Sequence, residues 1–198
     1  MKWTALGIDL LLGIGADKPM DNMESMFLPD FLMKGVSSST SNHGKLESEK
    51  IFQVNDLQAA PIQSSLFTTP LFILTLLSLL LFLPSLGFIQ NNSLKSLADR
   101  ILFIITGLLG MFLLCMWFGT DHESFSKNVN LIWALPMNIF FVFKLNNLKT
   151  WMIQFFKIWS LLILILIAVS LSFLGMINIA LYPIMLLMSY RYWMLSKK

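Results

Sequence analysis

Charged residues are scarce in this sequence. Asp, Glu, Lys and Arg make up 13% of its 198 residues, whereas soluble domains average about a quarter. Hydrophobic residues supply 56%, and the mean hydropathy is +0.72. A chain with so little charge lacks the surface of an ordinary soluble domain, so we expect a protein of the phospholipid bilayer. The net charge is only +3, and we expect no nucleic-acid partner.

Cysteine and recognisable catalytic motifs are also missing. Cys115 is the single cysteine, which excludes an internal disulfide, and it lies in an apolar run where a thiol is expected to be inert. The sequence contains no Gly-x-Ser-x-Gly, His-Glu-x-x-His or Walker motif and no pair of buried carboxylates. We therefore predict neither a metal site nor a cofactor.

Long apolar runs are what the sequence does contain. A transmembrane helix needs about 20 apolar residues, and strict alternation, the mark of a half-buried strand, occurs in none of the runs. The predicted fold class is therefore all-α: a polytopic membrane protein with five transmembrane helices and an N-terminal periplasmic segment. The third run is short and contains Pro136. The runs are Leu71–Ile89, Ile101–Phe118, Val129–Phe143, Met152–Leu174 and Met176–Leu195.

The basic residues predict the orientation. Eight of the fourteen fall on one side of the predicted helices, and only Asp99 among the acids joins them. Because cytoplasmic loops are enriched in Lys and Arg, this places the C-terminus in the cytoplasm and residues 1–69 and 119–128 in the periplasm, in a protein of the cell inner membrane. Tyr190, Tyr192 and Trp193 are typical of an interfacial anchor. The eight are Lys95, Arg100, Lys144, Lys149, Lys157, Arg191, Lys197 and Lys198.

Residues 1–69 differ in composition from the rest. We predict a periplasmic interfacial or linker segment over 1–69, with a flexible loop at 37–50, followed by a five-helix transmembrane domain over 70–198. The first residues resemble a signal peptide, but Asp9 interrupts the apolar stretch, which argues against cleavage. Residues 4–12 are expected to form a helix.

A polar stretch between the second and third runs is the candidate functional site. Asp121, His122 and Glu123 are adjacent, so they cannot all face one metal ion. Asp121 and His122 have the chemistry of a general acid–base pair, but no reactive nucleophile accompanies them. Asn128 is a good helix N-cap at the start of the third run. We interpret the stretch as a structured loop, with catalysis by Asp121 and His122 as the alternative.

Short motifs lie on both sides of the first two apolar runs. Their residues are Asp9, Asp17 and Pro29 before these runs, and Asp121, His122, Asn128, Asn130, Trp133 and Pro136 after the second. This pattern resembles the membrane half of the Lnb-type lipoprotein N-acyltransferases of Bacteroidota, from about Trp3 to the C-terminus. The resemblance implies a five-helix membrane domain that follows a periplasmic thiol-dependent catalytic domain, and transfer of an acyl chain from phospholipid to a lipoprotein.

The sequence begins at Met1, directly before these motifs, so no catalytic cysteine can be matched. A truncated gene, a split partner and a start codon assigned too late each account for this. The leading hypothesis is a membrane domain that anchors or supports a periplasmic acyl-transfer domain and is not catalytic alone. The alternative is an acyltransferase or acyltransferase subunit that uses Asp121 and His122. A transporter or channel is disfavoured by the shortage of intramembrane charge.

Overall fold

The structure is a computed structural model that describes residues 3–12, 40–41, 44–45, 66–85, 92–120, 125–172 and 176–198. The chain divides into two compact units. The larger comprises Met1–Asp17 and Ser64–Lys198, and the smaller comprises Lys18–Gln63. In the smaller unit, β1 (Thr40–Ser41) pairs with β2 (Gly44–Lys45) as a short antiparallel ladder inside the predicted loop 37–50.

Helices and the turns between them make up the described residues of the larger unit. This confirms the predicted all-α fold class. Each of the five apolar runs contains at least one helix, and the expected helix near the N-terminus is present as α1. In chain order the elements are α1 (Trp3–Leu11), the 3-10 helix η2 (Leu66–Thr68), α4 (Pro70–Phe82), η3 (Leu83–Ser85), α5 (Asn92–Gly119), η5 (Val129–Ile132), α6 (Met137–Val142), α7 (Thr150–Ser172), η6 (Ile179–Leu181) and α8 (Tyr182–Leu195).

Local sequence signals account for the bounds of α4. The Thr69 hydroxyl accepts a hydrogen bond from the backbone N–H of Phe72, and Pro70 follows at the first helical turn. Proline is tolerated there because its missing N–H would have no intrahelical partner. The α-helix ends at Phe82, and the tighter η3 that follows contains Pro84, which cannot continue the hydrogen-bond ladder of an α-helix.

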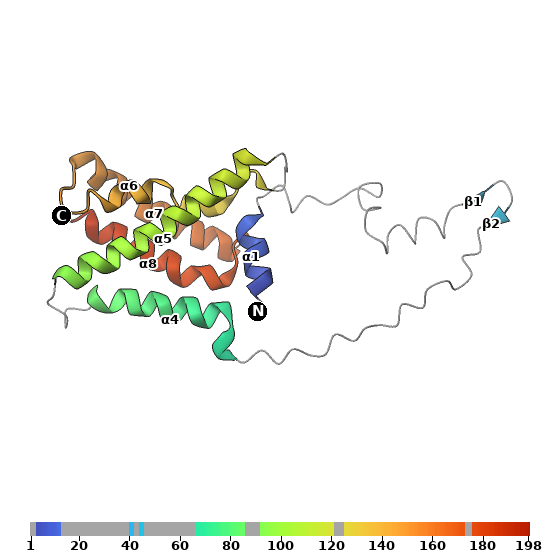
Figure 1. Cartoon of the computed structure of the whole chain (residues 1–198), viewed down its shortest axis with the longest axis horizontal. Coiled ribbons are helices and arrows are strands. Elements are labelled where there is room, and N and C mark those ends of the chain that lie inside the picture. Colours follow the sequence, from blue (N-terminus) through green and yellow to red (C-terminus); the bar gives the residue numbers. More distant parts are fainter. Residues whose placement is uncertain are drawn as a thin grey trace. The chain divides into compact units, whose positions relative to one another are not determined.

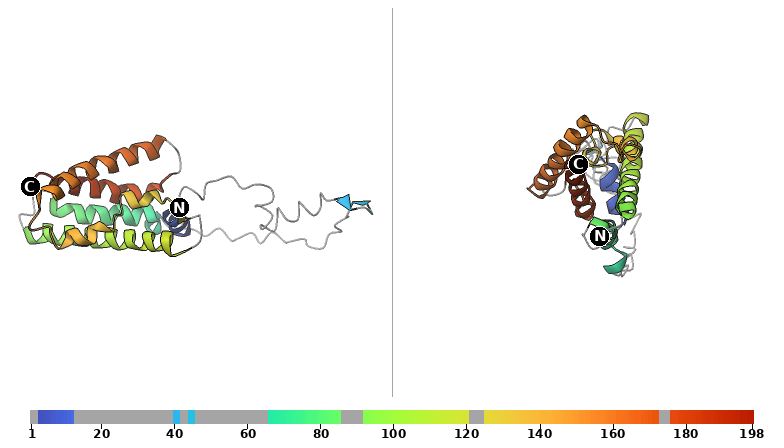
Figure 2. Two further views of the ribbon diagram at one scale, coloured as in Figure 1. Left: turned by 90° about the horizontal axis from the view of Figure 1, so that it is seen from above. Right: turned by 90° about the vertical axis from the view of Figure 1, so that its left-hand side faces the viewer.

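The long helices run side by side in the larger unit (Figures 1 and 2). At one end, which we call the α1 end, α1 lies beside η2, η5 and η6; the Trp3 indole N–H donates to the carbonyl of Thr68 there at 2.9 Å. The opposite end, which we call the basic end, holds η3, the first turns of α5, the 143–149 turn and the end of α8. The two ends therefore differ in both composition and structure.

Among the described residues, two helices have the length and composition to cross a membrane, Ser93–Gly119 and Thr150–Ser172. The third apolar run is broken: η5 is followed by a turn over 133–136 and then by the short α6. Irregular backbone is tolerated at membrane depth only where protein covers it. Trp133 and Ala134 are 1% and 0% exposed, so the turn meets this condition.

Glycines in α5 make room for that irregular segment. A Cβ at Gly110 would lie 2.0 Å from the carbonyl oxygen of Ala134, and one at Gly107 would lie 2.6 Å from a side-chain carbon of Ile139. Close backbone approach through small residues is a common way for helices to associate in lipid, where apolar burial supplies little driving force. The two glycines fix where the 133–139 segment packs.

Aromatic rings and buried polar groups hold the helices together. Phe103, Phe141, Phe156 and Tyr192 are fully buried, and the ring of Tyr192 lies 5.6 Å from that of Phe103 and 5.2 Å from that of Phe156. The Tyr192 hydroxyl donates to the side-chain oxygen of Asn138, and the side-chain NH₂ group of Asn138 donates to the Thr106 hydroxyl at 3.0 Å. This network joins α5, α6 and α8.

Polar side chains also join α7 to α8. Ser160 and Ser189 donate to each other's backbone carbonyl oxygens, both at 2.9 Å. The prediction of Tyr192 as an interfacial anchor was wrong, because its ring is fully buried and its hydroxyl is used inside the bundle. Trp193 is 46% exposed, as an anchor would be.

Candidate functional site

Asn128 connects two distant parts of the chain at the α1 end. Its side-chain oxygen accepts a hydrogen bond from the backbone N–H of Asn130 at 2.9 Å, so it caps η5 as predicted. Its side-chain NH₂ group donates to the carbonyls of Leu10 and Leu11, both at 2.9 Å. The last carbonyls of a helix have no intrahelical partner. Asn128 therefore caps the start of one helix and the end of another.

Asn130 repeats this arrangement one step further along. Its NH₂ group donates to the carbonyl of Leu10 at 3.2 Å and to that of Asp9 at 3.4 Å. Its side-chain oxygen accepts the indole N–H of Trp133 at 3.0 Å. The ring of Trp133 is 1% exposed, and its indole N–H holds the Asn130 side chain in the orientation that faces α1.

Asp9 fixes α1 from its other side. Its carboxylate accepts a hydrogen bond from the NH₂ group of Asn178 at 2.6 Å. The oxygen of the same Asn178 amide accepts from the backbone N–H of Ala180 at 3.0 Å and caps η6. Asp9 is exposed, whereas Asn178 is buried. Asp9, Asn128, Asn130, Trp133 and Asn178 together form what we call the α1-capping cluster.

The cluster explains how so short a helix is ordered. An isolated helix of fewer than about 12 residues is marginal in water, and α1 has nine. Amide side chains satisfy its terminal carbonyls, and Leu6 is buried against the bundle. Amides neither titrate nor attack substrates, and the one carboxylate of the cluster, Asp9, accepts the Asn178 amide, so the cluster has the chemistry of a structural contact that holds α1. Among the described residues, no three His, Cys, Asp or Glu side chains are grouped to hold a metal ion.

The remaining predicted site residues fall in different places. Asp17, Pro29, Asp121 and His122 lie outside the described residues. Pro136 precedes α6 at its N-cap position, beside Gly110. The structure thus brings together motif residues from both sides of α5. Asp9 in α1 and the Asn128–Asn130 region are more than 100 positions apart in sequence.

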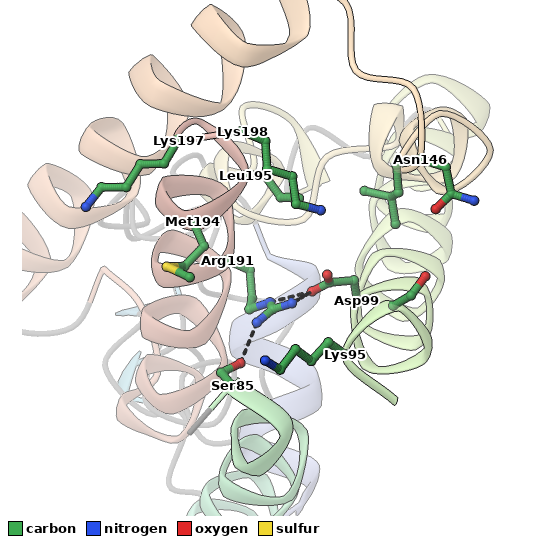
Figure 3. A pocket seen from close by; sticks show the side chains of 11 residues that line it. Ser85, Lys95, Asp99, Asn146, Arg191, Met194, Leu195, Lys197 and Lys198 are labelled. Atoms are coloured by element: carbon green, nitrogen blue, oxygen red, sulfur yellow. Dashed lines mark hydrogen bonds and ion pairs between the residues drawn. The ribbon is translucent and has the colours of Figure 1, made fainter. Parts of the chain in front are cut away.

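A second polar site lies at the basic end and was not predicted. The Arg191 guanidinium forms an ion pair with Asp99 and donates a further hydrogen bond to the Ser85 hydroxyl (Figure 3). Both charged side chains are buried, 8% and 7% exposed. Arg191 stands inside the fifth apolar run. A charge within such a run is costly unless it is paired, so its position was the available signal.

Neither a search of curated proteins nor one of solved structures found a match to this chain. The model of one protein family, described as the Lnb transmembrane domain, does match it. The match covers residues 62–198, well over half of the chain, and includes α4 through α8 together with both polar sites except for α1. It confirms the resemblance drawn from the motif residues, and the chain belongs to the Lnb transmembrane domain family.

Proposed function

We propose that this membrane domain anchors a periplasmic acyl-transfer domain, in the same polypeptide or a separate one, and is not catalytic alone. The α1-capping cluster carries the proposal. Three asparagine side chains from the family-matched region hold α1, which precedes that region. The bundle holds α1 through its C-terminal carbonyls and through Asp9. The part of the chain that precedes the bundle therefore has a defined place at the α1 end.

Orientation is part of the same proposal. The α1 end would face the periplasm and the basic end the cytoplasm, with the protein in the inner membrane. Of the eight basic residues on the predicted cytoplasmic side, seven lie in or near elements of the basic end, and the eighth, Lys157, lies further along α7. By contrast, Lys127 is the only basic residue among described residues 120–142. This charge bias is the one that sets topology in short loops.

The chemistry of the described residues favours support over catalysis. Cys115 is exposed on the apolar helix α5, and among the described residues it belongs to no group of three His, Cys, Asp or Glu side chains. Asp121 and His122 follow Thr120 in sequence and are the residues by which the alternative, an acyltransferase, would act. The substrates in that case would be a phospholipid and the amino terminus of a lipoprotein.

An acyl-transfer assay separates the two functions. The purified chain is incubated with phospholipid vesicles and a diacylated lipopeptide, and N-acylated product is measured by mass spectrometry. We expect no product above the protein-free control, with wild type or with His122→Gln. Transfer by the wild-type chain that disappears in His122→Gln would show that the chain is the enzyme and overturn the anchoring proposal.

Anchoring itself is measured by association. An Lnb-type periplasmic catalytic domain is co-expressed with the tagged chain, and its recovery from detergent-solubilised membranes is quantified. We expect recovery with wild type and a clear loss with the double variant Asn128→Ala/Asn130→Ala, which releases α1. Asn147→Ala is the matched control, since Asn147 is exposed in the 143–149 turn. Equal recovery from all three, or none from wild type, would contradict the proposed role.

A further inference from the structure

The basic end contains a pocket that the proposed anchoring role does not use. Its volume is about 590 Å³, which lies within the range of about 300–1,000 Å³ typical of small-ligand sites. It lies between η3, the start of α5, the 143–149 turn and the end of α8 (Figure 3). The lining residues that matter for its chemistry are Ser85, Lys95, Asp99, Asn146, Arg191 and Lys198.

The pocket carries an excess of positive charge. The charges of Arg191 and Asp99 compensate each other. Lys95 and Lys198 also line the pocket, and no described carboxylate lies within salt-bridge distance of either. Lys197 is different: its ammonium lies 3.3 Å from the centre of the Trp193 ring, and Figure 3 shows its side chain directed away from Asp99. The Lys198 ammonium also interacts electrostatically with Asp99. Three cationic groups, Lys95, Arg191 and Lys198, therefore face one carboxylate, which leaves two net positive charges for a ligand.

Arg191 contributes a preorganised donor. A guanidinium has five N–H groups. Asp99 engages two of the nitrogens and Ser85 the third, one N–H each, which leaves two of the five N–H groups. Burial and three contacts hold the plane of the group in place, so a bound anion would not have to order it. Arginine in such a position suits the oxygens of a phosphate or carboxylate.

Apolar surface continues from the pocket toward the bilayer. Leu94 and Leu97, which flank Lys95 and Ser96 on α5, are 43% and 52% exposed, and Met194 at the pocket wall is 39% exposed. A soluble anion would gain nothing from these side chains. A lipid that placed its phosphate in the pocket would also lay acyl chains on them, and basic pockets between membrane helices are known to bind lipid headgroups.

We propose that this pocket binds a phosphate-bearing anion through Lys95, Lys198 and the remaining Arg191 donors, and that the ligand is the headgroup of an anionic phospholipid. The site is at the opposite end of the bundle from the α1-capping cluster and is independent of the proposed anchoring role. Its ligand would hold η3, α5 and α8 together at the membrane surface.

Native mass spectrometry of the detergent-solubilised chain tests the lipid. The protein is equilibrated with equal amounts of phosphatidylglycerol and phosphatidylcholine, and the lipid that remains bound is identified. We expect preferential retention of phosphatidylglycerol by wild type. The double variant Lys95→Gln/Lys198→Gln should weaken its binding by at least about fivefold, because each lysine near a membrane surface contributes about that factor.

The control variant Lys144→Gln/Lys149→Gln removes two exposed ammonium groups from the 143–150 region without touching the pocket lining. It should change the binding of phosphatidylglycerol by less than about twofold. An equal loss in both double variants would mean general attraction to a basic surface and would overturn the pocket. Equal retention of the two lipids by wild type would overturn it as well.

A third arm separates a lipid headgroup from free phosphate. The thermal midpoint of the chain in neutral detergent is measured with inorganic phosphate and with a short-chain phosphatidylglycerol. We expect the lipid to raise the midpoint of wild type at concentrations at which phosphate does not, and to do so less in Lys95→Gln/Lys198→Gln. An equal rise with inorganic phosphate would assign the pocket to a soluble ligand and contradict the lipid. No rise with either would overturn the site.

Discussion

The carboxylate of Asp9 accepts a hydrogen bond from the side-chain amide of Asn178 at 2.6 Å, across 169 positions of sequence. Asp9 belongs to α1 and Asn178 caps η6, so the contact joins the first described helix to the start of the last one. Because Asp9 is exposed, water competes for its carboxylate and the contact stabilises less than a buried one would. The contact nevertheless fixes α1 in one position against η6.

Exchanging the two residues tests this contact. Asn178→Asp keeps an oxygen that can cap η6 but removes the donor and places a second carboxylate beside Asp9. We expect it to destabilise the docking of α1 by roughly 0.5–1.5 kcal/mol. Adding Asp9→Asn restores a donor and an acceptor in exchanged positions, so the double variant should recover most of the loss. Hydrogen exchange of the α1 amides measures both; no recovery in the double variant would contradict the contact.

Asn128 has two separable roles. Asn128→Ala loses the cap of η5 and the donors to α1, and we expect a loss of about 0.5–2 kcal/mol from the cap alone. Asn128→Asp keeps the capping oxygen but has no NH₂ group for the carbonyls of Leu10 and Leu11. Asp should therefore be tolerated better than Ala or Leu at η5, while α1 loses the two Asn128 contacts in all three variants and is held less firmly.

The measurement is again hydrogen exchange, compared between two regions. Faster exchange at the Asn130 amide is expected in the Ala and Leu variants and not in the Asp variant. Faster exchange in α1 is expected in all of them. Identical profiles for Ala, Leu and Asp would remove the capping role, and protection of α1 in the Asp variant would show that the carbonyl contacts do not hold it.

The close packing of α5 predicts that its glycines are not equivalent. Gly110→Ala would place a methyl group 2.0 Å from a backbone carbonyl oxygen, which cannot move as a flexible side chain does. We expect it to lower stability by about 1–3 kcal/mol, as overpacking does. Gly119→Ala in the same helix is the control, since nothing lies within 4 Å of its added Cβ. That change should be neutral or slightly stabilising.

Thermal unfolding in detergent compares the two variants. A midpoint for Gly110→Ala equal to that of Gly119→Ala would mean that the 133–136 turn does not lie against α5. Trimming side chains of the opposing segment is not expected to restore the midpoint of Gly110→Ala, because the added methyl group meets backbone atoms.

Composition was sufficient for the longest helices but not for the broken third run or for the contacts between helices. Apolar run length predicted α5 and α7, because it acts locally, whereas the third run, expected as one helix, is divided into η5 and α6. Asn128 was predicted as a cap since capping involves residues two positions apart. Its bonds to Leu10 and Leu11 depend on where α1 docks, and nothing near Asn128 in sequence encodes that.

Around Arg191 a local sequence pattern gave a wrong prediction. Its aromatic neighbours are typical of a membrane interface, which favoured an anchor. The helix instead turns Arg191 and Tyr192 inward and leaves Trp193 outward. Successive helical residues point about 100° apart, so a run of three or four cannot all face lipid. The polar partners Asp99 and Asn138, which lie on other helices, decide which of them turn inward.

The last prediction concerns how often the chain crosses the membrane. Two residues locate the segment between α5 and α7: Asn128 donates to α1, and Asn146 lines the pocket at the basic end. It thus extends between the two ends of the bundle, although it contains only short helices. A reporter at Ser124 should therefore be periplasmic, and reporters at Asn147 and after Lys198 should be cytoplasmic. This gives five crossings, with the irregular turn at 133–136 protected by α5. The same compartment at Ser124 and Asn147 would mean that the segment enters and leaves on one side, and an outward C-terminus would reverse the proposed orientation of both polar sites.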